Sequence, residues 1–245
     1  MITIDSVRKS FGQTCVISHF SLEIPTGQTH ILLGASGSGK TTLLRMIGGL
    51  TLPDEGRILL DQSPVNTLEP RERTTRLSFI TQEGGLFPHL SALDNILLPA
   101  RLRKKEKSEV LREAYELCEM VHLEKSLLDR LPQELSGGQR QRVSLVRGLI
   151  LKPEVLLLDE PLSALDPIVR SSLQQELKTI FKSLKKTVIM VTHDIQEASF
   201  LGDEITLLNK GYAVQTSSFE ELYHRPKENY VTDFLTAQLP VGLGS

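Results

Sequence analysis

The sequence predicts an α/β protein with a mainly parallel sheet, an N-terminal antiparallel β subdomain and an inserted α-helical subdomain. Three observations support this prediction. The opening third contains short segments with the alternation of half-buried strands. From residue 91 to residue 135, helical periodicity replaces that alternation. Farther along, apolar β-branched runs alternate with a helical stretch, which is typical of a parallel sheet with helices on its faces.

In the N-terminal third, apolar residues alternate with polar ones or form short buried runs. Pro25, Thr26 and Gly27 form a turn signal between two of these segments. A glycine-rich loop follows one run, and a helix at about residues 41–50 follows the loop. We expect strands near residues 2–7, 20–24, 30–33, 57–61 and 77–81.

The middle of the chain has the periodicity of helices. Ser91 and Asp94 form a candidate capping box at the start of one helix. A second helix has one apolar face, made by Val110, Ala114, Leu117, Cys118 and Val121. We therefore expect a helical subdomain inserted at about residues 86–135 into one domain of residues 1–235, with a tail at residues 236–245.

The second half alternates strands and helices. We expect strands at residues 155–158 and 187–191, with a helix at residues 167–184 between them. Asn209-Lys210-Gly211 resembles a guanine-reading motif but lacks its aspartate, because position 212 is tyrosine. We interpret it as a turn between two late strands.

Composition limits the function. The formal net charge of -2 does not favour nucleic acid as a partner. Cys15 and Cys118 have no metal-ligand spacing, and we expect both to be small buried residues. The sequence has no secretory signal and no apolar window of membrane-spanning length, so we expect a soluble protein that reaches a membrane only through a partner. The basic run 101–107 is interpreted as a solvated loop.

The glycine-rich loop has the pattern of a phosphate-binding loop and indicates a P-loop NTPase core. Its glycines let several backbone N–H groups turn inward, and the following helix N-terminus adds to this cradle for phosphate oxygens. Lys40 supplies a positive charge for the β- and γ-phosphates, and Thr41 a hydroxyl for Mg²⁺. The candidate nucleotide-binding residues of this segment are Gly34, Ala35, Ser36, Gly37, Ser38, Gly39, Lys40, Thr41 and Thr42.

Two carboxylates follow the apolar run at residues 155–158. Asp159 is placed to hold Mg²⁺, directly or through water. Glu160 is placed to position and deprotonate an attacking water, as a general base does. Beside a phosphate-binding loop, this pair predicts catalysis of nucleotide hydrolysis.

With these motifs and the segment Leu135-Ser136-Gly137-Gly138-Gln139, the chain resembles ATP-binding subunits of ABC transporters over nearly its whole length. The resemblance implies that residues 1–235 form an ABC-type ATP-binding domain. It also implies that Ser136, Gly138 and Gln139 bind the γ-phosphate held by the phosphate loop of a second copy. A hydroxyl, exposed N–H groups and a helix start make such an anion site plausible.

The same resemblance implies roles for three further residues. Gln82 corresponds to the glutamine that contacts Mg²⁺ and the attacking water, and His193 to the histidine that senses the γ-phosphate. Phe11 corresponds to the aromatic residue that stacks on adenine, although many members have tyrosine there. The implied catalytic set is Glu160, His193, Gln82 and Lys40, the metal-binding set is Thr41, Gln82 and Asp159, and the cofactors are ATP and Mg²⁺.

The resemblance also implies partners. These are a second copy in an ATP-sandwich dimer, transmembrane permease subunits and, indirectly, a substrate-binding protein, with no nucleic acid. We expect a peripheral position on the cytoplasmic face of the cell membrane. Residues 166–170 and 231–235 are similar to importer subunits for osmoprotectants such as glycine betaine, choline and proline. Importers of polar amino acids or sulfonates share much of this sequence and remain an alternative.

Two other classes of function are less favoured by the sequence. Chromosome- or repair-type ATPases insert a long coiled coil before the signature segment, whereas this chain has a compact helical region there. A regulatory module that only binds ATP would be expected to lack Glu160 or His193, and both are present.

Overall fold

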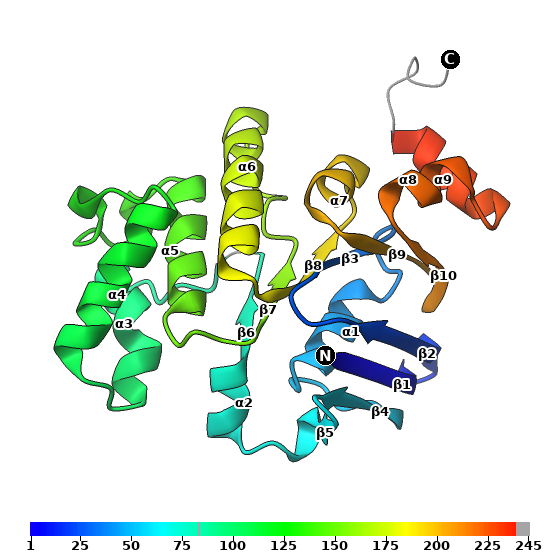
Figure 1. Ribbon diagram of the computed structural model, residues 1–245, viewed down its shortest axis with the longest axis horizontal. Coiled ribbons are helices and arrows are strands. Elements are labelled where there is room, and N and C mark those ends of the chain that lie inside the picture. The colour runs from blue at the N-terminus through cyan, green and yellow to red at the C-terminus, as the bar shows by residue number, and fades with distance from the viewer. Residues whose placement is uncertain (83, 239–245) are drawn as a thin grey trace. The chain divides into compact units, whose positions relative to one another are not determined.

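The computed structural model describes residues 1–82 and 84–238, and these form two compact units (Figure 1). The first unit contains residues 1–73 together with the C-terminal part from residue 185 onward, and the second contains residues 74–184. The predicted α/β fold class is confirmed: an antiparallel N-terminal sheet, mainly parallel strands and a helical subdomain are all present. Of the predicted tail, residues 239–245 lie outside the described residues.

The first unit begins with strands and returns to strands near the C-terminus. Its N-terminal elements are β1 (Ile2–Phe11), β2 (Thr14–Ile24), β3 (Thr29–Leu33), α1 (Lys40–Ile47), β4 (Glu55–Leu60), β5 (Ser63–Pro64) and η1 (Val65–Thr67). Its C-terminal elements are β8 (Thr187–Thr192), α7 (Ile195–Leu201), β9 (Glu204–Asn209), β10 (Tyr212–Ser217), α8 (Phe219–His224) and α9 (Asn229–Gln238). Helix α2 (Pro70–Arg76) contains the boundary between the units.

The N-terminal strands form an antiparallel sheet in the order β2-β1-β4-β5. Buried residues of β1 and β2 include Ile2, Ile4, Val7 and Phe20, so one face of this sheet packs into the core, and a register shift between Ile4 and Val7 moves the alternation by one residue. The alternation seen in the sequence therefore predicted the buried face correctly.

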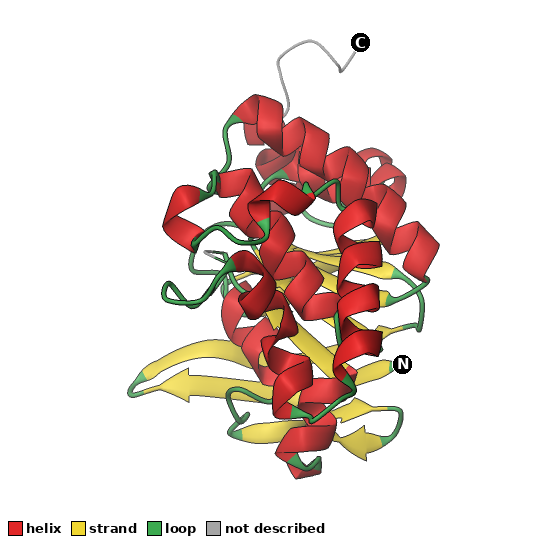
Figure 2. Ribbon diagram, turned by 90° about the vertical axis from the view of Figure 1, so that its left-hand side faces the viewer, coloured by secondary structure: helices red, strands yellow, loops and turns green. Residues whose placement is uncertain are grey.

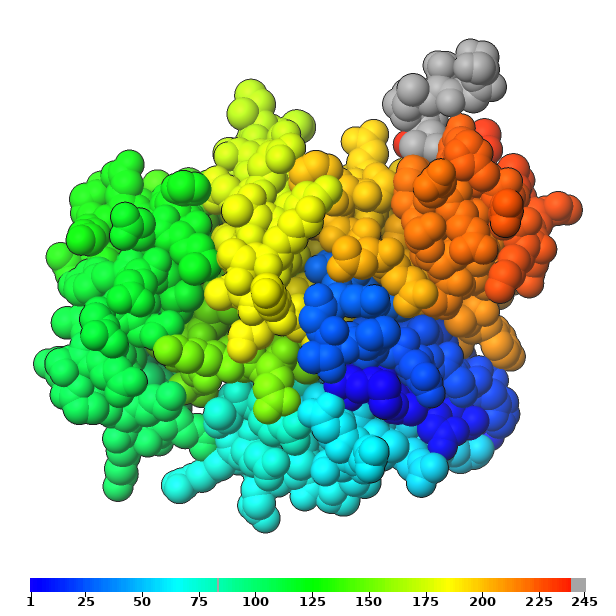
Figure 3. Space-filling view, viewed as in Figure 1, coloured from blue at the N-terminus to red at the C-terminus, as the bar shows by residue number. Residues whose placement is uncertain are grey.

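The remaining strands of this unit lie in the order β10-β9-β3-β8. Strand β3 pairs in parallel with β8 on one side and β9 on the other, and all five of its residues are buried. Figures 1 and 3 show the blue N-terminal and orange C-terminal segments side by side, and Ser18 N donates to Gly211 O at 3.2 Å. The turn predicted at residues 209–211 joins β9 to β10, with Lys210 and Gly211 both at positive φ.

The second unit contains one parallel strand pair and the helical subdomain. Its elements are β6 (Leu77–Ile80), α3 (Ala92–Leu102), α4 (Lys107–Met120), η2 (Lys125–Leu127), η3 (Pro132–Glu134), α5 (Gly137–Leu149), β7 (Val155–Asp159) and α6 (Pro167–Leu184). Helix α5 packs on β6, α3, α4 and α6, so it is the central helix of this unit. Figure 2 distinguishes the helices of the chain, in red, from its strands, in yellow.

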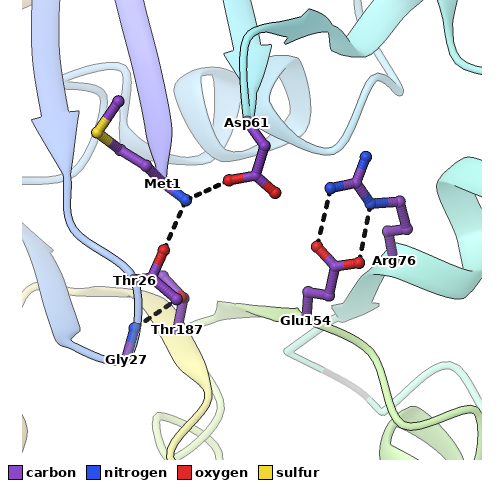
Figure 4. Close-up of polar contacts among 7 residues, drawn as sticks. All are labelled: Met1, Thr26, Gly27, Asp61, Arg76, Glu154 and Thr187. Carbon is purple, nitrogen blue, oxygen red and sulfur yellow. Dashed lines mark hydrogen bonds and ion pairs between the residues drawn. The ribbon is translucent and has the colours of Figure 1, made fainter.

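Polar contacts fix strand ends within each unit (Figure 4). In the first unit, Gly27 N donates to Thr187 Oγ1 at 3.0 Å, which ties the turn before β3 to the start of β8. In the second unit, Arg76 and Glu154 form a two-pronged ion pair with distances of 3.0 and 2.9 Å just before β6 and β7. These contacts set the register of strands whose opposite ends carry the predicted site residues.

Several local predictions are modified by the structure. Ser91 caps α3 by accepting from Asp94 N, but Asp94 accepts from the Ser91 hydroxyl, so the pair is a cap without the reciprocal backbone bond of a capping box. Cys118 is buried as predicted, whereas Cys15 is exposed at the hairpin of β1 and β2, so that prediction was wrong. None of the described helices is long and apolar enough to cross a membrane.

The basic run 101–107 is only partly a loop. It begins in the last turn of α3 and ends at the first residue of α4. Arg101 pairs with Asp94 at 2.8 Å, and Arg103 donates to Thr74. Part of its charge is therefore used in local contacts on the surface of the subdomain.

Candidate active site

The phosphate-binding loop joins β3 to α1, as predicted. Gly34, Gly37 and Gly39 have φ values of 154°, 79° and 101°. A Cβ atom on Gly34 would lie 2.4 Å from Leu208 O, so this position needs glycine on steric grounds as well. The loop is closed by a bond from Ser38 N to Ala35 O at 3.2 Å.

Lys40 is buried at the first position of α1 and folds back over the loop. Its Nζ donates to Gly34 O at 2.8 Å and to Ala35 O at 2.9 Å. The ammonium charge therefore lies at the loop and the N-terminus of α1, where both favour an anion. Thr41 and Thr42 follow in the first turn and are half-buried, while Ala35, Ser36 and Gly37 are exposed.

The Ser38 hydroxyl gives a test of whether the loop fits a phosphate. Its Oγ is buried and has no hydrogen-bond partner among the described residues. It lies inside the loop, 2.9 Å from where a Cβ of Gly34 would be. A buried hydroxyl without a partner is costly, and an incoming phosphate oxygen would satisfy it. The donor set of this loop therefore fits a nucleotide phosphate.

His193 lies beside the phosphate loop because of the strand register. Leu33 of β3 is paired with Thr192 of β8, so Gly34 and His193 each follow the last paired residue at the same edge. His193 is exposed, and the next residue, Asp194, caps α7 by accepting from Gln196 N and Glu197 N. The fold thus brings the predicted histidine to the phosphate loop.

Phe11 ends β1 with an exposed ring. Its relative exposure is 54%, and Lys9 Nζ lies 5.4 Å from the ring centroid. The neighbouring β2 contacts the loop, since a Cβ on Gly39 would lie 2.9 Å from Val16 O. An exposed aromatic ring on this hairpin is available for stacking on a base.

In the second unit, the parallel pairing of β6 and β7 brings Gln82 and the two carboxylates to one edge. Ile80 is paired with Leu158, so Gln82 and Asp159 follow at adjacent strand ends. Asp159 is buried, and Gln82 is exposed. Carboxylate and amide oxygens are ligands suited to Mg²⁺, so these residues fit the predicted metal site.

Glu160 has an unusual backbone conformation. Its φ of 46° places a non-glycine residue in the left-handed region, which costs free energy and is common at functional sites. Its carbonyl accepts from Ser163 N at 3.3 Å and Ser163 Oγ at 3.0 Å. These bonds form a turn directly after β7, which holds the backbone at Glu160.

The segment 135–139 forms the N-terminus of α5. Ser136 is its N-cap and forms a capping box with Gln139: Gln139 N donates to Ser136 Oγ at 3.3 Å, and Ser136 N donates to Gln139 Oε1 at 2.9 Å. A Cβ on Gly138 would lie 2.7 Å from Val169 Cγ1. The glycine therefore lets α6 approach the helix start, and leaves backbone N–H groups open at a positive helix end.

Comparisons with known proteins agree with this geometry. The sequence profile of the ABC transporter family matches residues 17–163. The chain belongs to the ABC transporter family. Within it, the chain is an ATP-binding subunit of the importer type and an ABC transporter ATPase.

Two relatives illustrate the similarity. The chain is 43% identical over 238 residues to the sulfate/thiosulfate import ATP-binding protein CysA of Acinetobacter baylyi, covering 96% of this chain and 67% of that protein. It is 41% identical over 235 residues to the spermidine/putrescine import ATP-binding protein PotA of Nitrosospira multiformis, with coverages of 96% and 64%. The chain therefore spans about two thirds of the length of these relatives.

Solved structures show the same fold. A dimeric structure of MJ0796, a bacterial ABC transporter cassette, matches with a TM-score of 0.80 and 34% identity, covering 89% of this chain and 99% of that one. A dimeric post-hydrolysis state of the ATP-binding cassette MJ0796, bound to ADP and Pi, matches with a TM-score of 0.79 and 33% identity over the same shares.

Sequence reasoning missed the side chains that hold the loop after Gln82. Ser144 and Arg147 of α5 bind its glycine carbonyls, and Asn95 of α3 binds the backbone of Phe87 and Leu90. Each of these residues lies within a regular helix, where a polar residue carries no sequence signal for what it contacts. Only the packing of the helices on the loop identifies them.

Proposed function

We propose that this chain is the ATP-hydrolysing motor of a membrane importer and that it works as a pair of copies. The phosphate loop binds ATP, and the segment 135–139 of the second copy closes over the γ-phosphate. The observation that carries the proposal is the unsatisfied Ser38 hydroxyl beside Lys40, inside a loop built by glycines at positive φ. The dimeric structures of the similar cassette support the pairing.

In the proposed reaction, Glu160 accepts a proton from water as the water oxygen attacks the γ-phosphorus. The bond from that phosphorus to the bridging oxygen breaks, and ADP and phosphate leave. Thr41, Gln82 and Asp159 would hold Mg²⁺, which supplies charge neutralisation for the phosphates. His193, at the edge of β8, donates to the γ-phosphate and senses its presence.

The decisive experiment is hydrolysis by a Glu160→Gln variant. Loss of a general base is expected to lower turnover by about 10² to 10⁴ while ATP still binds. Glu119→Gln, an exposed carboxylate on α4, is the matched control and keeps wild-type turnover. Full turnover by Glu160→Gln would refute the role of Glu160.

A comparison with Lys40→Ala separates a motor from a module that only binds ATP. The motor predicts turnover in the wild type and background in the variant, because the β- and γ-phosphates lose a direct positive charge. Equal background rates in both proteins would instead support a binding-only function.

The transported substrate is proposed separately. We propose an importer of osmoprotectants such as quaternary amines, on the similarity of residues 166–170 and 231–235; polar amino acids or sulfonates are the alternative. The relatives named above act, by their names, in sulfate/thiosulfate and spermidine/putrescine import, at nearly equal identity, so they do not favour one substrate. The test is to assemble the transporter with its permease and binding protein and to measure its ATPase rate with each class of candidate substrate. The class that stimulates the rate identifies the transported substrate.

The partners and location follow from this function. Transmembrane permease subunits would receive the closing motion, and the chain would lie peripherally on the cytoplasmic face of the membrane. Phe87, 45% exposed in the loop after Gln82, offers an apolar contact for such a partner. Co-purification of the chain with membranes only when the permease subunits are present would test this arrangement.

A further inference from the structure

The loop of residues 84–90 follows Gln82 and is held almost entirely through its backbone. Asn95, buried in α3, accepts from Phe87 N at 2.8 Å, and its amide donates to the carbonyls of Phe87 and Leu90 at 3.1 and 3.0 Å. These bonds fix the far end of the loop. The near end, next to Gln82, is fixed by a different helix.

That near end is gripped by two residues of α5. Arg147 donates from one guanidinium nitrogen to Gly85 O at 2.8 Å and from the other to Gly84 O at 2.6 Å. Ser144 Oγ donates to Gly84 O at 2.8 Å. Three donors thus converge on two adjacent carbonyls, two and three residues beyond Gln82.

Within the part of the chain that the structure describes, the Arg147 guanidinium is hydrogen-bonded to the carbonyls of Gly84 and Gly85 and forms no ion pair with a carboxylate. Burial lowers the pKa of Arg147 below its usual value, so the protein bears the cost of partly desolvating this cation. By contrast, Arg142 on the same helix forms an ion pair with Glu176. Among the described residues, this half-buried arginine is bonded to two loop carbonyls, which indicates that it holds the loop.

The loop backbone is shaped for this grip. Gly84 and Gly85 have φ values of 73° and 56°, and Gly84 N donates to Thr81 O at 2.9 Å. This bond ties the gripped carbonyls to the turn that contains Gln82. At the next position of α5, Gly148, a Cβ would lie 2.8 Å from Ile80 Cδ1, so the helix lies directly against β6 at this point.

We infer that Arg147, assisted by Ser144, is a positioning residue for Gln82: it holds the glycine turn so that the Gln82 side chain keeps its direction at the end of β6. Gln82 touches the metal and water in the proposed function, and Arg147 acts only through it. The inference rests on that proposed function. It also connects the two ends of α5, because the N-cap of this helix is Ser136, the residue proposed to bind the ATP of the second copy.

The first test is hydrogen exchange of the nucleotide-free full chain. In Arg147→Met, amides of residues 84–90 should exchange at least several-fold faster than in wild type, while those of residues 135–139 stay unchanged. Arg112→Met, an exposed control on α4, should leave residues 84–90 unchanged. Unaltered exchange at residues 84–90 in Arg147→Met would overturn the inference without any reference to ATP.

The second test is a double-mutant cycle on ATP turnover. Arg147→Met should lower kcat by about 10- to 100-fold and raise the Mg²⁺ concentration needed for half-maximal rate, because Gln82 is misplaced. When Arg147→Met is combined with Gln82→Ala, kcat should stay within about 2-fold of the value for Gln82→Ala alone. The exposed control Arg112→Met should leave kcat unchanged, both alone and in the Gln82→Ala background. Multiplicative effects for Arg147→Met and Gln82→Ala would overturn the inference.

Two milder variants cover the case in which Arg147→Met does not fold. Arg147→Lys keeps the charge but cannot reach both carbonyls in a fork, and Ser144→Ala removes one donor. Each should show a smaller effect that also disappears in the Gln82→Ala background. A wild-type chain without ATPase activity would refute the proposed function itself, whereas an active wild type with independent variants would refute only the positioning role.

Discussion

Gly37 and Gly39 of the phosphate loop share a positive φ but differ in what a side chain would meet. Around Gly37, no heavy atom lies within 4 Å of an added Cβ, whereas at Gly39 the Cβ would lie 2.6 Å from Ile17 Cδ1 and 2.9 Å from Val16 O. The first position therefore demands glycine only for backbone conformation, and the second also because β2 approaches it closely.

This difference predicts unequal stabilities for two alanine variants. Gly37→Ala should lower the free energy of unfolding by about 1 kcal/mol, from the conformational penalty alone. Gly39→Ala should cost about 2 to 4 kcal/mol, because the penalty and the contact with a backbone carbonyl add. Urea unfolding of the two variants beside wild type measures both values. Equal losses of stability in the two variants would contradict this prediction, because they would show that β2 moves away from the added Cβ without loss of stability.

His30 is fully buried, and its burial lowers the pKa to about 4 from the ordinary value of 6.5. Its Nε2 is hydrogen-bonded to Thr206 Oγ1 at 2.8 Å. Glu204 Oε2 lies 3.4 Å from Nδ1 but makes no hydrogen bond with it, so the desolvation of the charged ring outweighs this carboxylate.

The lowered pKa of His30 makes stability depend on pH. Between pH 6.5 and pH 4 the unfolded chain binds a proton that the folded chain does not, so the contribution is complete above pH 6.5 and is lost as the pH falls. The total loss by pH 4 is about 3 kcal/mol. The difference between His30→Gln and wild type in unfolding free energy should therefore shrink across this window.

At the scale of elements, α6 and α2 show what sequence patterns reveal. The helix predicted at residues 167–184 has the observed bounds, because Asp166 caps it, Pro167 starts it and Leu173, Leu177 and Ile180 form its buried face. Helix α2 was not predicted, since none of its residues is buried and it has no apolar periodicity. Burial leaves a periodic signal in the sequence, whereas an exposed connecting helix does not.

The pairing of α5 with α6 is another feature without a sequence signal. Arg142 and Glu176 are 34 residues apart and form a two-pronged ion pair at 3.0 and 2.7 Å, with side chains only 17% and 12% exposed. Ser172 Oγ adds a bond to Glu176 Oε1 at 3.2 Å. Each residue alone resembles an ordinary charge on a helix surface.

This ion pair predicts that a single variant loses much more stability than the double variant. Arg142→Met should cost about 3 kcal/mol, because it leaves Glu176 buried without its partner, and adding Glu176→Leu should recover most of the loss. The exposed pair Arg112–Glu116, at 3.7 Å, is the control, and Arg112→Met should change stability by less than about 0.5 kcal/mol. Urea unfolding tests the series, and a double variant as unstable as the single one would contradict it.

At the scale of the whole molecule, the sequence predicted the fold class and the segments that carry the site, but it could not derive their assembly. The phosphate-binding loop and the strand end at residue 159 are each predicted from a short local sequence pattern. The register that brings His193 beside Gly34, the positive φ of Glu160 and the grip of Arg147 depend on which strands and helices become neighbours. Periodicity in the sequence predicts which residues are buried but not which strands and helices become neighbours, so these features follow only from the three-dimensional packing.

The use of the segment 135–139 by a second copy can be tested by mixing two inactive chains. Lys40→Ala removes the loop charge, and Gly137→Asp places a carboxylate where a phosphate would bind at the start of α5. In a twofold pair, a mixed dimer has one damaged site with both changes and one intact site, made from the loop of one chain and the segment of the other. Random mixing should restore about a quarter of wild-type turnover.

Each parent protein alone should remain at background, because both sites of its own dimer lack one part. The rate of the mixture should rise with total protein concentration as dimers exchange. Lys40→Ala mixed with Glu160→Gln should give no rescue, since both residues belong to the part of the site that is proposed to come from the chain holding the phosphate loop. A Gly137→Asp chain that is fully active alone would show that α5 does not complete the site. Rescue in the first mixture but not in the second would establish that every ATP is held by two chains.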